Sequence, residues 1–338
     1  MAKTQNRLYH SDHKILGKEL PLEQPYVLLV DPSSLCNLRC RFCPTGNHEL
    51  IKQTGRYQGN MSLELFKKII DDLKEFPEPV NVLRLYKEGE PLLNPSLPEM
   101  VQYARESGYV KIIDTTTNGV SLNPVLNRRL IEAGLDRINI SVNGLSAGQI
   151  KDYTRVTVDF QRYLDNIKDL YDHRGDCEIY IKSIQELYTE DEQQRFYDVF
   201  RPMADIVFLE HISPAWMEFV FDDMPMRFSK GHYGQEIEER LVCPYIFYIM
   251  VVNADGSVSL CVGDWKHQLI YGDVNKDSVK DIWNNDVIRQ HRLMHLQGRR
   301  KENKVCGVCQ VVSHGTLEDI DSYREQIKKR MMDKEDLS

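Results

Sequence analysis

The sequence lacks any hydrophobic run long enough to cross a lipid bilayer. Its longest apolar runs are Tyr26 to Val30 and Ile246 to Val252, and both are far shorter than the ~20 residues that a transmembrane helix needs. The opening segment, Met1 to Lys14, is polar and charged, without the apolar stretch of an export signal. We therefore expect a cytoplasmic protein that has no membrane partner.

The sequence also has little positive charge. It contains 43 Lys and Arg against 51 Asp and Glu, a formal net charge of −8, so nucleic acid is not an expected partner. There is no low-complexity linker and no repeat beyond an alternation of strand and helix patterns. With 41% hydrophobic residues in 338, the chain can bury the core of one large domain and a smaller addition.

Short β-branched runs alternate with helical patterns through the first two thirds of the chain. This order predicts a parallel sheet with right-handed helical crossovers. Six such units fall short of the ~250 residues of a closed eight-stranded barrel, so the expected fold class is α/β, a partial (β/α)6 barrel. The expected strands are 26–30, 80–86, 110–114, 137–142, 178–184 and 206–210, and the expected helices are 62–76, 97–108, 124–133, 160–173 and 190–201.

The pattern changes after about Pro214. Segments 245–253 and 257–261 predict a hairpin around Asp255-Gly256. A helix over 278–292, capped by Ser278, is expected next. The resulting division is an N-terminal extension (1–24), a barrel (25–215), a linker (216–242), a small α+β domain (243–312) and a C-terminal helix (313–338).

Three of the eight cysteines form a close group. The spacing Cys36-x3-Cys40-x2-Cys43 follows directly on the first strand, in a loop at the face where βα barrels do chemistry. Thiols in an intracellular chain are expected as ligands or buried groups rather than disulfides. Three thiolates leave one iron of a [4Fe–4S] cluster without a protein ligand, and that iron can bind a substrate. The alternative is a zinc site that His48 would complete.

This spacing, with Phe42 just before the third cysteine, resembles the radical S-adenosylmethionine (SAM) superfamily. The resemblance implies a partial (β/α)6 barrel in which the open iron chelates SAM. It implies that a reducing partner such as a flavodoxin or ferredoxin drives SAM cleavage, and that the resulting 5′-deoxyadenosyl radical takes a hydrogen atom from the substrate. The cofactor carries this chemistry, and the protein positions and shields it.

The resemblance extends to polar residues after successive strands. Gly89-Glu90-Pro91 matches the latter part of the family's Gly-Gly-Glu-Pro motif, which holds the SAM ammonium, although Glu88 replaces the first glycine. Each polar residue taken alone would be assigned to a turn or a cap, whereas their recurrence at strand ends favours a SAM site. The cofactor-binding residues implied in this way are Phe42, Gly89, Glu90, Asn118, Ser141 and Arg155.

A second group of four cysteines lies in the last third: Cys243, Cys261, Cys306 and Cys309. It contains one close pair, whereas a zinc ribbon would contain two; a structural zinc site is the alternative. The arrangement resembles the twitch domain, a shortened SPASM domain that carries one auxiliary [4Fe–4S] cluster. Four cysteines would saturate that cluster, which favours a role in electron transfer. Cys177 stands apart and is expected to be a structural thiol.

The spacing of the second group resembles the aminocyclitol dehydrogenases, which implies oxidation of a secondary alcohol on a small-molecule substrate, a sugar or cyclitol. Three alternatives stay open: modification of a ribosomal peptide, redox-neutral epimerisation or elimination on a carbohydrate or nucleotide, and a non-catalytic metal-binding scaffold. Candidates for the proton acceptor are Lys182, Glu210 and His211, on the late strands. The basic run at residues 299–304 is expected to be a solvated loop.

Overall fold

The computed structural model describes residues 2–6, 15–216, 218–219 and 228–333. Parts of the expected N-terminal extension, linker and C-terminal helix therefore lie outside the described residues. Nine strands form one sheet in the order β6-β5-β4-β3-β2-β1-β7-β8-β9. They are β1 (Val27–Val30), β2 (Val80–Leu85), β3 (Val110–Thr117), β4 (Arg137–Ser141), β5 (Glu178–Ile184), β6 (Ile206–Glu210), β7 (Ile249–Val252), β8 (Ser257–Ser259) and β9 (Ile270–Asp273).

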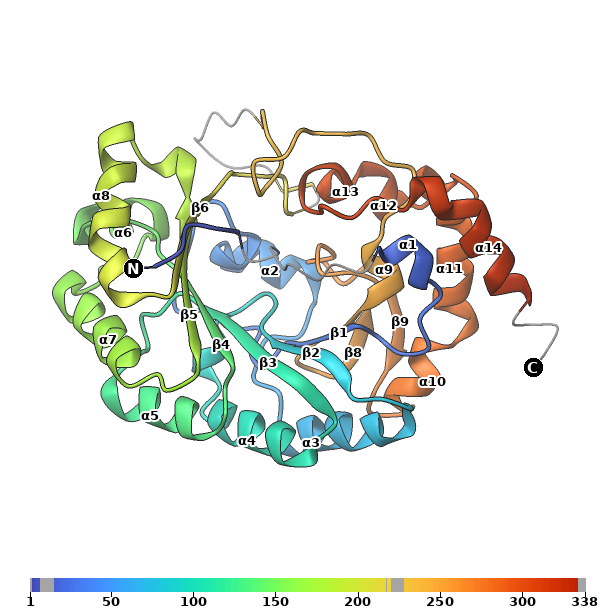
Figure 1. Ribbon diagram of the computed structural model, residues 1–338, viewed down its shortest axis with the longest axis horizontal. Helices are drawn as coiled ribbons and strands as arrows, with labels where there is room; N and C mark the ends of the chain where they lie inside the picture. Colours follow the sequence, from blue (N-terminus) through green and yellow to red (C-terminus); the bar gives the residue numbers. More distant parts are fainter. Residues whose placement is uncertain (1, 7–14, 217, 220–227, 334–338) are drawn as a thin grey trace.

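Strands β1 to β6 are parallel and follow the chain in order across the sheet, which confirms the predicted βα alternation. Figure 1 shows α3, α4, α5, α7 and α8 along the outer side of the curved sheet, with α10, α11 and α14 at the opposite end. The helices are α1 (Leu16–Glu19), α2 (His48–Thr54), α3 (Leu63–Asp72), α4 (Leu97–Ser107), α5 (Pro124–Glu132), α6 (Ala147–Thr154), α7 (Phe160–Asp172), α8 (Glu190–Phe200), α9 (Tyr245–Tyr248), α10 (Val279–Trp283), α11 (Asp286–Leu296), α12 (Lys304–Val308), α13 (Val311–His314) and α14 (Arg324–Asp333).

Local sequence explains where these helices begin and which face they bury. The Ser62 side chain accepts a hydrogen bond from the Leu65 amide at the start of α3, and Thr189 forms a capping box with Glu192 at the start of α8. Such caps satisfy amides that the helix itself leaves without partners. Helix α7 buries Ile167 among other apolar residues on one side, as expected of a helix packed on a sheet.

The C-terminal part is joined to the barrel more closely than a separate small domain would be. The predicted hairpin is present, with β7 and β8 antiparallel, but residues 245–248 form the short helix α9 rather than strand. Strand β7 also pairs in parallel with β1, so the barrel sheet continues into the hairpin. One hydrophobic cluster contains both Leu28 of β1 and Trp283 of α10. The two regions therefore share a core.

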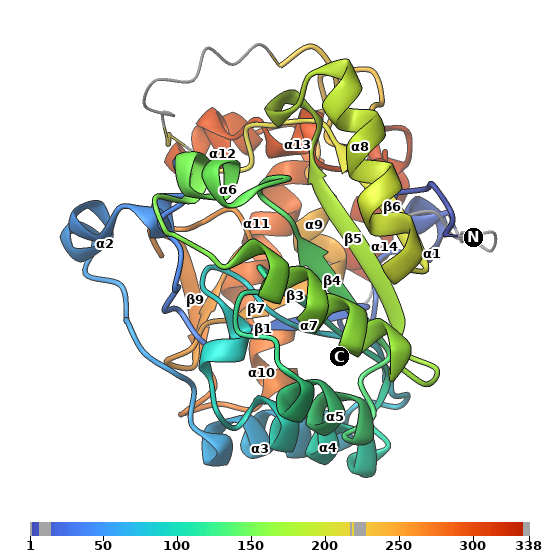
Figure 2. The same ribbon diagram turned by 90° about the vertical axis from the view of Figure 1, so that its left-hand side faces the viewer.

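Three further differences from the sequence expectations concern helices and the N-terminus. The helix expected over 278–292 is two helices, because Asn285 caps a new one, α11. Helices α2 and α6 were not expected, and Figure 2 shows α2 projecting from the body of the molecule. Lys3 of the N-terminal extension forms a parallel bridge with Ile206 at the edge strand β6. No helix among the described residues is long and apolar enough to span a membrane.

Candidate functional site

The first cysteine set (Cys36, Cys40 and Cys43) lies in the loop after β1, and its three thiols are free. Burial raises the pKa of each thiol, that of Cys36 to about 12. The charge of a neighbouring thiolate raises the pKa of Cys36 and Cys40 further. The Leu38 amide lies 3.5 Å from the Cys36 sulfur and donates to it. Buried thiols gathered in this way suit a strongly cationic group that draws them into the thiolate form.

The end of helix α6 fixes the backbone of this loop. The Arg39 amide donates to the Thr154 carbonyl at 2.9 Å, and the Arg41 amide donates to the Tyr153 carbonyl at 3.0 Å. Arg155 follows directly and ends α6 in the left-handed region, with φ at 56° and an exposed side chain. The resemblance implies that Arg155 contacts the SAM carboxylate, and the fold places its backbone beside the cysteine loop.

The loop after β2 packs on the segment that leads into the first cysteine set, and glycine is required there. A Cβ atom on Gly89 would lie 2.1 Å from the Ser33 carbonyl oxygen and 2.3 Å from that of Leu35. The Glu90 amide donates to the same Leu35 carbonyl at 2.7 Å. The Gly89-Glu90 motif is thus held by direct backbone packing on the segment before the cysteine loop.

Glu90 is buried and fully engaged. Its Oε1 accepts from the Thr117 hydroxyl at 2.6 Å and the Leu92 amide at 3.0 Å, and its Oε2 accepts from the Asn118 amide at 2.7 Å. Burial raises the pKa of this carboxyl to about 7, and the Asn118 amide opposes that rise. The Asn118 side chain in turn donates to Asn37, between the first two cysteines, at 2.7 Å. The carboxyl ends of β2 and β3 and the cysteine loop therefore form one connected structure.

The other two residues implied as cofactor contacts are placed as follows. Ser141 is the last residue of β4 and lies on the same edge of the parallel sheet. Phe42 is partly buried against the core. Their contacts to SAM stay predictions.

The second cysteine set (Cys243, Cys261, Cys306 and Cys309) is assembled from separate segments, and its thiols are also free. Cys243 precedes α9, Cys261 follows β8, and the close pair belongs to α12 and its C-cap. Burial raises the pKa of all four, that of Cys243 to about 12, and neighbouring thiolates of the set raise the pKa of Cys243, Cys261 and Cys306 further. Cys177 is buried elsewhere, beside Asp136 and Asp205.

Arg300 lies against this second set, which corrects the expectation that residues 299–304 form a wholly solvated loop. Its side chain is buried, with 6% of the residue exposed, and donates to the Cys306 carbonyl. The loop approaches closely enough that a Cβ on Gly307 would lie 2.8 Å from the Lys301 carbonyl oxygen. By contrast, the neighbouring Arg299 is exposed and pairs with Glu302.

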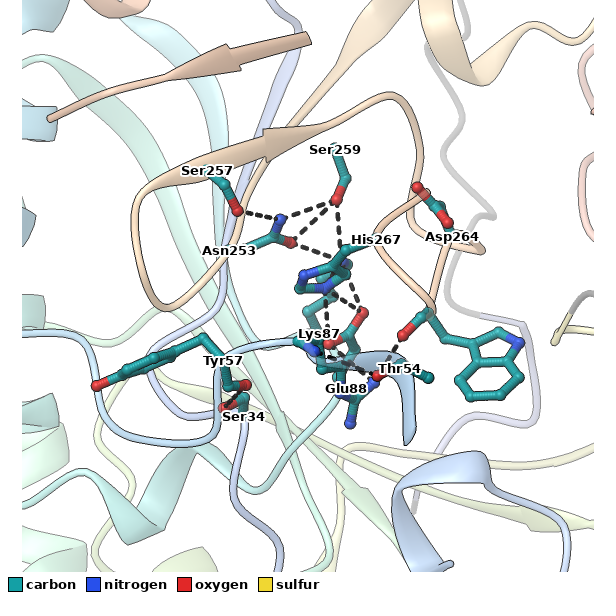
Figure 3. Close-up of polar contacts among 12 residues, drawn as sticks. Ser34, Thr54, Tyr57, Lys87, Glu88, Asn253, Ser257, Ser259, Asp264 and His267 are labelled. Carbon is teal, nitrogen blue, oxygen red and sulfur yellow. Dashed lines mark hydrogen bonds and ion pairs between the residues drawn. The ribbon is translucent and has the colours of Figure 1, made fainter. Parts of the chain in front are cut away.

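A buried charge network connects the barrel with the loop after Cys261 (Figure 3). The Glu88 carboxylate lies 2.7 Å from Lys87 Nζ, 3.1 Å from the Arg56 guanidinium and 3.0 Å from His267 Nε2. Burial alone would raise the pKa of Glu88, but Lys87, His267 and Arg56 lower it to about 2. The carboxylate is therefore charged in the folded protein.

The same network reaches both cysteine sets. Arg56 donates to the Thr45 hydroxyl, two residues after Cys43, at 2.8 Å and to the Trp265 carbonyl at 3.0 Å. His267 has a left-handed backbone, with φ at 54°, a conformation that is held only where the surroundings impose it. Sequence reasoning missed Arg56 and His267. The replacement of the motif's first glycine by Glu88 was the one signal that cations had to lie nearby.

The late strands bring together two of the three predicted proton acceptors. Lys182 Nζ lies 2.5 Å from Glu210 Oε2, and His232 Nε2 lies 3.0 Å from the same oxygen. His211 instead contacts Glu186 through Nδ1 at 2.9 Å. His232, on the chain after β6, was not predicted, because nothing in the sequence indicates that this segment returns to the strand ends.

The donor chemistry of the two cysteine sets suits iron–sulfur clusters, because each set gathers buried free thiols that act on one another. Among the described residues, no three His, Cys, Asp or Glu side chains are arranged so that they could hold one metal ion. A tetrahedral zinc site needs sulfur atoms about 2.3 Å from a common centre, whereas a four-iron cluster spreads its thiolate ligands more widely. Nearby backbone amides partly offset the effect of burial: those of Thr45 and Gly46 lower the pKa of Cys43, and those of Val311 and Val312 lower the pKa of Cys309. Amide donors of this kind stabilise thiolates.

Comparisons with known proteins agree with this reading. Residues 30–182 match the radical SAM superfamily, and residues 243–310 match the SPASM iron–sulfur cluster-binding domain. The Fe-coproporphyrin III synthase of Methanosarcina barkeri (strain Fusaro / DSM 804) is 34% identical over 110 residues, 32% of this chain and 25% of that protein. The chain's matches span about a quarter to a third of the length of this and the next curated relatives.

Solved structures of similar fold cover much more of the chain. The crystal structure of BtrN in complex with AdoMet and 2-DOIA aligns with 88% of this chain and 97% of its own, at a TM-score of 0.55 and 19% identity. Native anSMEcpe with bound AdoMet and Cp18Cys peptide aligns with 91% and 96%, at a TM-score of 0.54 and 15% identity. At these identities the likeness concerns the fold.

The two family matches together account for both cysteine sets, each on the kind of domain that sequence reasoning assigned to it. They also give the chain its cofactors, SAM and two [4Fe–4S] clusters. The protein belongs to the radical SAM superfamily and carries a C-terminal SPASM-type iron–sulfur domain.

Proposed function

We propose that the first cysteine set holds the cluster that binds and cleaves SAM, and that the second set holds the auxiliary cluster. The supporting observation is the difference in ligand number: three thiols leave one iron open to SAM, while four thiols leave none. Gly89, Glu90, Asn118, Ser141 and Arg155 would contact SAM, because they gather at the carboxyl edge of the sheet around the cysteine loop. Phe42 would shield the cluster.

The net reaction that we propose is oxidation of a secondary alcohol on a sugar or cyclitol. When bound, SAM and its cluster supply the hydrogen-abstracting group, and the auxiliary cluster supplies the electron acceptor. The alcohol carbon would give up a hydrogen atom, the hydroxyl a proton and the resulting radical one electron, for which the auxiliary cluster would supply the acceptor; the product would be a ketone. The four-thiol saturation of the second set carries this proposal. The fold likeness to a structure that holds AdoMet and 2-DOIA supports it.

The hydroxyl proton needs an acceptor, and the candidate is the group of three contacting side chains Lys182, Glu210 and His232. Its members lie at or near the carboxyl ends of β5 and β6, the edge that βα barrels use for substrates. The Lys182 side chain is 14% exposed and that of His232 is 21% exposed, so both reach the surface, whereas Glu210 is buried between them. His211 takes a secondary place, since its ring is engaged by Glu186.

The test is anaerobic turnover with SAM and a panel of deuterated cyclitols and sugars. The expected product is lighter than the substrate by two hydrogen atoms, with one 5′-deoxyadenosine per product and the carbinol deuterium in that 5′-deoxyadenosine. Cys306→Ala should retain uncoupled SAM cleavage and lose product. A product of unchanged mass that carries solvent deuterium would instead establish epimerisation and remove the electron-acceptor role.

A second candidate function is peptide modification. It is favoured by the fold likeness to anSMEcpe, whose structure contains a bound peptide. The same radical step would then act on a side chain, and the same proton and electron acceptors would serve. A mass change confined to peptides in the turnover assay would favour this function over the first.

A further inference from the structure

Arg300 occupies an unusual position for a charged side chain. It is 6% exposed, and one of its terminal nitrogens donates to the Cys306 carbonyl. Its Nε has no hydrogen-bond partner among the described residues. In the part of the chain that the structure describes, no carboxylate lies within 4.0 Å of its guanidinium. A buried charge without a counter-charge is strongly unfavourable, so the missing counter-charge needs an explanation.

The side chains around Arg300 do not provide a counter-charge. Glu239 is close enough to be affected by Arg300, but it is exposed and pairs with Lys301 at 2.8 Å. His295 is buried beside Arg300, and burial, together with the Arg300 charge, lowers its pKa to about 3, so its ring is neutral. The buried Asp264 carboxylate acts on Cys261 and Cys306, but it accepts from the Gln268 and Leu269 amides and forms no ion pair with Arg300. Arg300 itself lies beside the second cysteine set, since its guanidinium donates to the Cys306 carbonyl. Its charge acts on Cys243, Cys306 and Cys309.

We infer that Arg300 is the built-in counter-charge of the auxiliary cluster and that it makes this cluster an electron acceptor. This inference rests on the proposed assignment of the second cysteine set as cluster ligands. A cluster with four thiolates is negative and becomes more negative on reduction. A fixed, unpaired positive charge beside it stabilises the reduced state more than the oxidised state, because the attraction grows with the added electron. The free Nε–H can in addition donate to a cluster sulfur, which has the same effect.

The position of Arg300 in the fold keeps that charge close to the cluster. It begins the 3-10 turn Arg300–Glu302, which packs on α12, the helix that carries Cys306. The side chain and the backbone of this turn therefore approach the same cysteine pair.

The test compares Arg300→Gln with Arg299→Gln. Both variants remove one arginine charge at adjacent positions, but Arg299 is 56% exposed and pairs with Glu302. The measurement is an EPR-monitored redox titration of the auxiliary cluster, carried out without SAM or substrate in a Cys36→Ala, Cys40→Ala, Cys43→Ala background so that one cluster reports. Arg300→Gln should lower the equilibrium constant for reduction at least tenfold, a shift of ~59 mV for one electron. Arg299→Gln should shift it less than about twofold.

Arg300→Lys separates charge from hydrogen bonding. It should recover most of the shift if the charge dominates, and it should behave like Arg300→Gln if the Nε–H donor dominates; either result supports a role toward the cluster. Equal reduction constants in the wild type, Arg300→Gln and Arg299→Gln would overturn the inference while leaving the cluster assignment intact. A parent protein that binds no second cluster would instead overturn the proposed function.

If Arg300→Gln fails to retain the cluster, the cluster-free proteins decide the matter. Without a cluster the Arg300 charge has no counter-charge, so cluster-free Arg300→Gln should be at least as stable toward urea as the cluster-free parent. A marked loss of stability would show that Arg300 only supports the Cys306 carbonyl, and the inference would fall.

Discussion

The two cysteine sets each have a buried arginine beside them, but the two arginines differ in their charge partners. Arg56, near the first set, lies 3.1 Å from the fully buried Glu88 carboxylate. Arg300, near the second set, has no carboxylate partner among the described residues. Each arginine has an Nε without a hydrogen-bond partner in the described part of the chain, so the contrast lies in charge. The arginine near the first set is therefore paired with a carboxylate, whereas the arginine near the second set has no carboxylate within 4.0 Å among the described residues. An opposing charge at the second set is the buried Asp264 carboxylate, which acts on Cys261 and Cys306.

This difference matches the roles that we propose for the two clusters. A cluster that must deliver an electron to SAM benefits from a low potential, and nearby compensated charge does not raise it. A cluster that must accept an electron benefits from an uncompensated cation. The network around Glu88 thus has two effects: it neutralises Arg56 and, through His267 and the Trp265 carbonyl, it attaches the loop after Cys261 to the barrel.

The largest expected effect comes from removing the thiols of the first cysteine set. Replacing Cys36, Cys40 and Cys43 together by Ala should abolish 5′-deoxyadenosine formation and halve the iron, from about eight to about four per chain. The measurement is iron and sulfide analysis together with chromatography of the SAM products. Cys177→Ala is the matched control, because this buried thiol belongs to neither set, and it should keep both iron and activity. Stoichiometric zinc at the second set would contradict the two-cluster assignment.

Glu88→Gln should destabilise the cluster-free protein by about 3–5 kcal/mol, because it leaves Lys87 and Arg56 buried without their carboxylate. Urea unfolding measures this change. Glu302→Gln, which breaks the exposed pair with Arg299, is the control and should have little effect. A small effect of Glu88→Gln would mean that the network is not a structural link between the regions.

The stability that the Glu88 carboxylate contributes should depend on pH. The folded pKa of Glu88, about 2, lies below its ordinary value of 4.5, so its charge stabilises the fold above pH 4.5. This contribution should be lost as the pH falls from 4.5 toward 2. The stability of the wild type should therefore approach that of Glu88→Gln over this range.

Affinity for SAM should depend on residues near the first cysteine set and not on the cysteines of the second set. Glu90→Gln alters the carboxyl group that accepts from the Asn118 amide and the Thr117 hydroxyl, and Arg155→Ala removes the proposed contact to the SAM carboxylate. Each should weaken SAM binding about tenfold to a hundredfold, as measured by equilibrium binding to the anaerobic protein. Cys306→Ala should leave the affinity unchanged. Unaltered binding in both site variants would remove these residues from the SAM site without affecting the family assignment.

The smallest expected effect on the reduction constant of the first cluster is that of removing Arg56 and Glu88 together. Glu88→Gln alone should raise the reduction constant of the first cluster, because it uncovers Arg56. The double variant Arg56→Gln, Glu88→Gln should return it to within about twofold of the wild type, since a near-neutral pair contributes little field. A redox titration of the first cluster in a Cys306→Ala background measures both. If the double variant shifted the constant as much as Arg300→Gln does for the second cluster, the proposed contrast between the two arginines would be wrong.

Local patterns in the sequence were sufficient for the fold class and for the division of the cysteines between a radical SAM domain and a SPASM domain. The βα alternation, the caps at Ser62 and Ser278 and the Asp255-Gly256 turn depend on neighbouring residues, so they can be read along the chain. The first cysteine set is equally a property of spacing, because Cys36, Cys40 and Cys43 are close in sequence. The second set is only partly so, because the fold brings Cys243 and Cys261 to the pair Cys306 and Cys309.

The charge environment of the clusters was decided only by tertiary structure. Arg56 and Glu88 are 32 residues apart, and the Trp265 carbonyl joins them from 209 residues beyond Arg56. Arg299 and Arg300 are neighbours in the same basic run, yet one is exposed and the other is buried. The sequence sets the sign of the charge on each residue. The effect of that charge on a nearby cluster depends on burial and on which partner lies within a few ångströms. Both of these are properties of the packed chain, since Coulomb interactions depend on distance and on the surrounding dielectric.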